Sequence, residues 1–160
     1  VLSLNHNSQR YQSFGIPIVG DREQAYSGPL LGILSAMHWF RDQGSAMKPD
    51  HLACFPADVP AFPHDVVSQL ASRLGSEAAD VAYVYHRRQI QPLFSLWRPD
   101  LIEKIEQAVA AGLYGPKLVF GSLRTTAVAC EDNFPGCFDN INSPEDLAAA
   151  ARIIAPNRCA

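Results

Sequence analysis

The sequence lacks several features that would place it in common protein classes. No apolar run approaches the roughly 18 residues that a membrane-spanning helix needs. Residues 1–5 lack the charged start and the cleavage site of a signal peptide. The 13 basic and 16 acidic residues give a net charge of -3, which leaves no basic face for nucleic acid. We therefore expect a cytoplasmic protein that binds neither a membrane nor nucleic acid.

Metal-binding and nucleophile motifs are also missing. The five histidines lack the H-x-x-x-H spacing of a zinc site, and no serine lies in a nucleophile elbow, so the catalytic residues stay unknown. The cysteines form no C-x-x-C pair, and we interpret them as reduced thiols rather than as disulfides or zinc ligands. They are Cys54, Cys130, Cys137 and Cys159.

The sequence does contain strand and helix patterns in alternation. With 160 residues and 48% hydrophobic content, we expect a single domain over residues 1–160. The alternation predicts an α/β fold, with a mostly parallel, Rossmann-like sheet and helices on both faces. Strands are expected at 1–4, 16–19, 81–85, 93–97 and 126–129, and in the run that leads to Asp58. Helices are expected at 8–14, 30–40, 64–74, 99–111, 118–123 and 144–154.

Two acids follow predicted strands. Asp58 ends the run from His51, and Asp21 follows the strand at 16–19. The carboxyl ends of strands line the ligand crevice of open α/β sheets, and Mg²⁺ prefers one or two carboxylates plus substrate phosphates. Asp58 is therefore the candidate metal ligand. The alternatives are that Asp58 caps a turn and that Asp21 is a turn residue.

Two further motifs accompany the acids. Residues 28–32 read Gly-Pro-Leu-Leu-Gly and open a helix, where Gly28 permits close backbone approach and free N–H groups favour an anion. Simple helix initiation explains the same residues. Asn140 and Asn142 flank one apolar residue, so both could point to the same side of an extended segment. They could bind a ligand or metal-bound water, or could serve as capping or turn residues.

In this order and spacing, the motifs resemble the molybdenum cofactor guanylyltransferase (MobA) family over nearly the whole chain. The resemblance rests on Asp21, residues 28–32, residues 55–60, Gln91-Pro92-Leu93 and residues 138–147. It implies a Rossmann-like nucleotidyltransferase fold. It also implies transfer of GMP from GTP to molybdopterin with Mg²⁺, which yields the guanine dinucleotide form of the cofactor and pyrophosphate.

The resemblance assigns roles to single residues. Asp58 matches the aspartate that binds Mg²⁺ and GTP, Asp21 matches a second acid on the nucleotide, and Asn5 matches an asparagine on the purine and ribose side. Five positions fall in segments on the substrate side, near the pterin or the metal: Gly28, Gln91, Pro92, Asn140 and Asn142. Cytidylyltransferase relatives share Asp-x-Pro, but Gly-Pro-Leu-x-Gly favours the guanylyl branch.

The chain departs from the family pattern at its start. The glycine-rich loop resembling L-A-G-G-x-S-x-R-M-G-x-D-K, which cradles the triphosphate, is absent, and Val1 corresponds to the second strand. We expect a truncated or remodelled homologue with weakened or no activity. The alternatives are a fragment of an active enzyme, and a non-catalytic module that binds nucleotide, pterin or a partner protein. Lys117, Arg87, Arg88 and Arg124 are the local cations, and nothing in the sequence directs them to the site.

The expected loss of the first strand has a consequence for the sheet. In a doubly wound order the first strand separates the second strand from the Asp58 strand, so its loss leaves bare edges. Such edges pair readily with another chain. We expect the gap to close by direct strand pairing, by rearrangement, or by formation of a homodimer.

Overall fold

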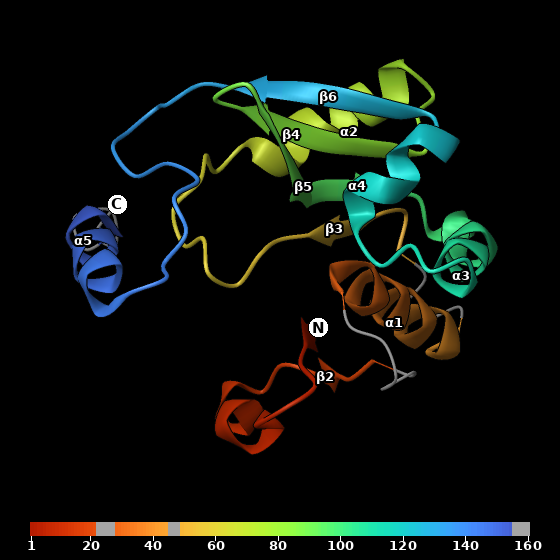
Figure 1. The fold of residues 1–160 in the computed structure, drawn as a ribbon, viewed down its shortest axis with the longest axis horizontal. Helices are drawn as coiled ribbons and strands as arrows, with labels where there is room; N and C mark the ends of the chain where they lie inside the picture. Colours follow the sequence, from red (N-terminus) through yellow and green to blue (C-terminus); the bar gives the residue numbers. More distant parts are fainter. Residues whose placement is uncertain (22–27, 45–48, 155–160) are drawn as a thin grey trace. The chain divides into compact units, whose positions relative to one another are not determined.

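The computed structural model describes residues 1–21, 28–44 and 49–154 (Figure 1). Contacts divide the chain into two compact units, and each is described by itself. The first unit comprises Val1–Leu52 and Trp97–Thr125, and the second comprises Ala53–Leu96 and Thr126–Ala160. Helices and strands occur in both units, so the predicted α/β class is confirmed. The single domain stays a prediction.

The first unit begins with two short strands joined by a 3-10 helix. These elements are β1 (Leu2–Ser3), η1 (Ser8–Phe14) and β2 (Ile18–Val19). β1 and β2 pair in parallel, with Leu2 opposite Ile18. Gly15 ends η1 in the left-handed conformation, with φ 65°, as the predicted helix stop requires.

Helix α1 (Pro29–Asp42) forms the centre of the first unit. It packs against both α3 (Ile102–Ala110) and the β1–β2 pair. The sequence predicted an amphipathic helix, but α1 is buried on almost every side between Leu30 and His38. A helix with apolar residues on all sides is usually buried in the protein, as α1 is here. The remaining helical segments of this unit are η3 (Pro99–Leu101), α4 (Pro116–Val119) and η4 (Phe120–Ser122).

The body of the second unit is a four-stranded sheet in the order β3-β5-β4-β6 (Figure 1). Its strands are β3 (Leu52–Cys54), β4 (Val81–His86), β5 (Gln89–Trp97) and β6 (Thr125–Cys130). Arg87 and Arg88 form the two-residue turn between β4 and β5, with φ of 47° and 63°. Two left-handed residues are what a type I′ hairpin turn needs, so β4 and β5 run antiparallel.

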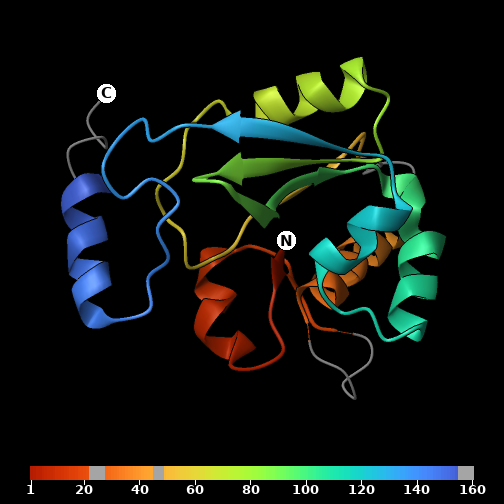
Figure 2. The same cartoon turned by 45° about the horizontal axis from the view of Figure 1, so that its top comes forward.

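Helix α2 (Val66–Ser76) covers β4 in the second unit (Figure 2). Its buried residues, Val66, Leu70 and Leu74, recur every fourth position and form one apolar stripe. They join the core of this unit, which also contains Ala82, Val84, Phe94, Leu96, Val128 and Phe138. Helix α5 (Pro144–Ile154) ends the described chain. None of the helices in the described ranges is long and apolar enough to cross a membrane.

The described strands form two separate sheets. β1 and β2 make one, and β3 is an edge strand of the other. Direct strand pairing, rearrangement and dimerisation all stay predictions for how the predicted gap closes.

Candidate functional site

Asp58 lies in a turn beyond β3 rather than at the end of the strand. The strand ends at Cys54, since Pro56 has no N–H to continue a ladder. Aromatic rings fix the segment that carries Asp58. Phe55 stacks on Phe62 with ring centroids 5.2 Å apart, and each of these two rings makes an edge contact with the buried ring of Phe94. The Asp58 turn is therefore tied to the core of the second unit.

The structure brings Asp58 and Asn140 together, although 82 positions separate them. Asn140 Nδ2 donates a hydrogen bond to Asp58 Oδ2 at 3.1 Å. One residue further on, the Ile141 N–H donates to the Asp58 carbonyl oxygen at 2.7 Å. Two motifs that the sequence singled out thus meet within the second unit, and Asn140 orients the Asp58 carboxylate.

The Asp58 carboxylate fits a magnesium site in which the protein supplies one carboxylate ligand. Asp58 is exposed, and within the described ranges its Oδ1 has no hydrogen-bond partner. The same ranges contain no group of three or more His, Cys, Asp or Glu residues that could hold a metal. Mg²⁺ commonly takes one or two carboxylates and fills its other positions with water and substrate phosphates.

A second cluster anchors the segment before Asn140. Arg87 contacts both carboxylate oxygens of Asp132. Its Nε donates a hydrogen bond to Oδ2 at 3.1 Å, and its Nη2 forms an ion pair with Oδ1 at 2.9 Å. Its Nη1 donates to Asp139 Oδ1 at 2.9 Å. Arg87 lowers the pKa of the Asp132 carboxyl, mainly by its hydrogen bond to that carboxylate. No sequence pattern pointed Arg87 toward this cluster, because its partners lie about 50 positions away.

Buried His86 and Phe138 complete this anchor. His86 Nδ1 lies 2.9 Å from the Cys130 carbonyl, and its Nε2 lies 3.2 Å from Asp132 Oδ1 without hydrogen-bond alignment. The His86 ring packs on Phe138 at 4.7 Å. Phe138 has a left-handed φ of 62°, which is rare for a large side chain, and its N–H donates to Ala61. No sequence pattern signals this conformation.

The structure pairs Asn5 with Asp21 in the first unit. Asn5 Nδ2 donates to Asp21 Oδ2 at 2.7 Å, and the Asp21 N–H donates to Asn5 Oδ1 at 2.8 Å. Asp21 Oδ1 is buried without a partner in the described part of the chain. A buried carboxylate oxygen without a donor is costly, so this atom fits a ligand hydroxyl or N–H.

A groove of about 490 Å³ lies beside this pair. Its lining includes Leu4 and Gly20, which directly precede Asn5 and Asp21 in the chain. The other lining residues are Ser8, Gln12, Ile16 and Ile18. The lining combines the apolar side chains of Leu4, Ile16 and Ile18 with the polar side chains of Ser8 and Gln12.

Gly28 has a structural explanation within the first unit. A Cβ at this position would lie 2.5 Å from the Tyr114 carbonyl oxygen, which accepts a hydrogen bond from Leu30 N–H at 3.0 Å. The Leu31 N–H donates to the Gly28 carbonyl. The chain itself therefore occupies two first-turn donors that the sequence left open to an anion. The substrate-side role of Gly28 stays a prediction.

The remaining predicted residues make other hydrogen bonds within the second unit. Gln91 and Pro92 lie half-buried on β5, and the Pro92 carbonyl accepts a hydrogen bond from Ser95 Oγ at 2.8 Å. The Asn142 N–H donates to Asp146 Oδ2 at 3.0 Å, at the start of α5. Their predicted positions near the pterin or the metal stay predictions.

The described cysteines are free thiols: Cys54, Cys130 and Cys137. Burial raises the pKa of Cys54 to about 12, which keeps this thiol protonated and poorly nucleophilic at neutral pH. Cys159 lies outside the described residues.

Comparison with known proteins identifies the class. Residues 1–126 match the MobA-like NTP transferase domain, so the chain is a nucleotidyltransferase of α/β fold. A protein of Archaeoglobus fulgidus, molybdopterin-guanine dinucleotide biosynthesis protein A, has a similar fold. Its TM-score is 0.67 at 19% identity, over 96% of this chain and 77% of that one.

Sequence relatives identify the family within that class. The molybdenum cofactor guanylyltransferase of Burkholderia ambifaria is 34% identical over 161 residues, which cover 95% of this chain and 74% of that protein. The enzyme of the same name from Shewanella loihica is 29% identical over 97% of this chain and 75% of its own length. The chain belongs to the MobA family, which the motifs around Asp58 and Asn140 predicted.

Proposed function

We propose that this chain binds GTP with Mg²⁺ and carries the site for GMP transfer to molybdopterin. The relatives' shared name, molybdenum cofactor guanylyltransferase, supports the reaction class. The observation that carries the proposal is the contact of Asn140 with Asp58, because it unites two distant motifs at an exposed carboxylate.

Each pair of residues has a separate role in this proposal. Asp58 would hold Mg²⁺, and the bound ion would supply positive charge against the nucleotide phosphates. Asn140 fixes the Asp58 carboxylate by its hydrogen bond to Oδ2. In the first unit, taken by itself, Asn5 fixes Asp21, whose buried Oδ1 would accept a hydrogen bond from a nucleotide.

The two alternatives from the sequence predict different behaviour. A non-catalytic module that binds only pterin or a partner protein would need no magnesium site. A module that binds nucleotide, and a fragment of an active enzyme, would both need one, so a magnesium site at the Asp58–Asn140 pair would favour nucleotide binding. Weakened transfer by these 160 residues, and a cytoplasmic location, stay predictions of this proposal.

Calorimetric titration of GTP and Mg²⁺ into the 160-residue chain tests the proposal. We expect binding that requires Mg²⁺, exceeds the binding of CTP, and falls at least about tenfold in Asp58→Ala, since a charged contact contributes about 1.5–3 kcal/mol. Asp65→Ala is the matched control, because Asp65 is an exposed acid of the same unit at the start of α2.

The possible results separate the alternatives. GTP-selective binding lost in Asp58→Ala and kept in Asp65→Ala supports the proposal, and a transfer assay with molybdopterin would then measure activity. Absence of GTP binding, or equal loss in both variants, would overturn it. Pterin binding without GTP binding would favour the non-catalytic module.

A further inference from the structure

We propose that Arg87 is a positioning residue for the Asp58 site. Its ion pairs hold the segment 132–139 on the β4–β5 hairpin, and this segment leads directly into Asn140. The inference deepens the proposed function and rests on it only for the effect on Mg²⁺ and GTP. The positioning itself concerns the protein alone.

The contacts form one continuous path within the second unit. Arg87 binds both ends of the segment, through Asp132 and through Asp139. Asp139 is followed at once by Asn140, whose amide donates to the Asp58 carboxylate. An Asp139 side chain fixed by Arg87 therefore limits the positions that the Asn140 amide can reach.

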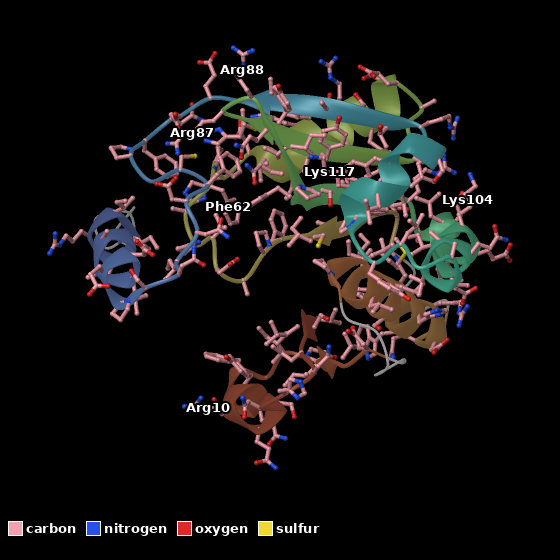
Figure 3. The ribbon with its side chains drawn as sticks, viewed as in Figure 1. Arg10, Phe62, Arg87, Arg88, Lys104 and Lys117 are labelled. Atoms are coloured by element: carbon pink, nitrogen blue, oxygen red, sulfur yellow. The ribbon has the colours of Figure 1, made fainter. Side chains whose placement is uncertain are left out.

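The backbone of the hairpin is unusual at both turn residues, and only the side chain of Arg87 contacts the segment 132–139. Type I′ turns strongly prefer Asn and Gly, yet both turn residues here are arginines with positive φ. Residues in such conformations persist where the surrounding contacts determine them, and they gather at functional sites. Figure 3 shows Arg87 directed toward the segment after β6, and Arg88 directed away from it.

The side chains of Arg87, Asp132 and Asp139 are about half exposed, which limits how much their ion pairs stabilise the segment. Arg87 is 52% exposed, Asp132 48% and Asp139 56%, and isolated ion pairs at such exposure contribute little. Here the Arg87–Asp132 contact is forked and belongs to a network that includes buried His86. We therefore expect loss of Arg87 to loosen this segment locally while the fold persists.

Hydrogen exchange of the Ile141 amide tests the inference without any ligand, because this N–H donates to the Asp58 carbonyl. In the full 160-residue chain, we expect Arg87→Asn to speed Ile141 exchange about fivefold. The Val84 amide in β4 should not change. Arg88→Asn makes the same substitution in the same turn and should leave Ile141 unchanged. Arg87→Lys should restore part of the protection.

The same variants are then titrated with GTP over a range of Mg²⁺ concentrations. We expect Arg87→Asn to raise the Mg²⁺ concentration needed for half-maximal GTP binding about fivefold, and Arg73→Gln, which loses an exposed ion pair on α2, to leave it unchanged. Unchanged Ile141 exchange in Arg87→Asn, or equal acceleration at Ile141 and Val84, would overturn the inference. If wild type fails to bind GTP, the proposed function fails, and the exchange data still decide whether Arg87 positions the segment.

Discussion

Gly28 lies where the first unit leaves no room for a side chain. The Tyr114 carbonyl oxygen and Cβ lie 2.5 and 2.6 Å from the place where a Gly28 Cβ would be. The carbonyl belongs to the backbone, so it cannot rotate away. Gly32 differs, because a Cβ there would meet Ser3 Oγ at 2.7 Å, the end of a side chain that can rotate.

Substitution of these glycines should therefore have graded effects. We expect Gly28→Ala to lower the free energy of unfolding by about 1–3 kcal/mol, as overpacking does, and Gly32→Ala to cost less. Gly75→Ala on α2 is the control, since nothing lies within 4 Å of its Cβ position. It should be neutral or raise stability by up to about 1 kcal/mol. Urea denaturation measures all three, and equal effects at Gly28 and Gly75 would contradict the packing.

At the scale of elements, the start of α5 is a reciprocal cap. Ser143 Oγ accepts the Asp146 N–H at 3.1 Å, while Asp146 Oδ2 accepts the N–H groups of Asn142 and Ser143. These bonds, led by the one from Asn142, lower the pKa of Asp146. The cap ties α5 to the segment that contacts Asp58, so helix and site share residues.

The lowered pKa predicts how the stability of α5 depends on pH. Because the folded pKa is below the ordinary aspartate value of about 3.9, the cap stabilises fully above that value and weakens as pH falls through the folded pKa. NMR hydrogen exchange at Ala149, followed from pH 7 to pH 2, should show this loss. Asp146→Asn should remove that part of the pH dependence, and Ser143→Ala should cost about 1 kcal/mol of local stability at pH 7. An unchanged pH profile in Asp146→Asn would contradict the cap.

At the scale of the whole molecule, the position of β3 in its sheet bears on assembly. β3 is an edge strand of its sheet, and edge strands present N–H and C=O groups that pair readily with another chain. The homodimer expected from the sequence remains our proposal for how this edge is covered.

Light scattering during size-exclusion chromatography tests the dimer. We expect a mass twice the 17.5 kDa of one chain that falls toward one chain on dilution. A single species of 17.5 kDa at every concentration, with a cooperative melt, would contradict dimerisation and favour rearrangement within the chain.

The sequence alone determined the elements that depend on neighbours along the chain. Ser143-Pro144 predicted the start of α5, and Gly15 predicted the end of η1. A helix was predicted at 64–74, and α2 spans Val66–Ser76. The order of the short motifs along the chain also predicted the family, because each motif is a continuous stretch of sequence that can be read without the fold.

Only the tertiary structure decided which distant residues meet. Three contacts join residues far apart in the chain. Asn140 contacts Asp58, Arg87 pairs with Asp132 and Asp139, and Tyr114 lies against Gly28. Local pattern fixes periodicity and caps, since those depend on bonds within one or two turns. Contacts between distant residues depend on how the elements pack, which no short stretch of sequence records.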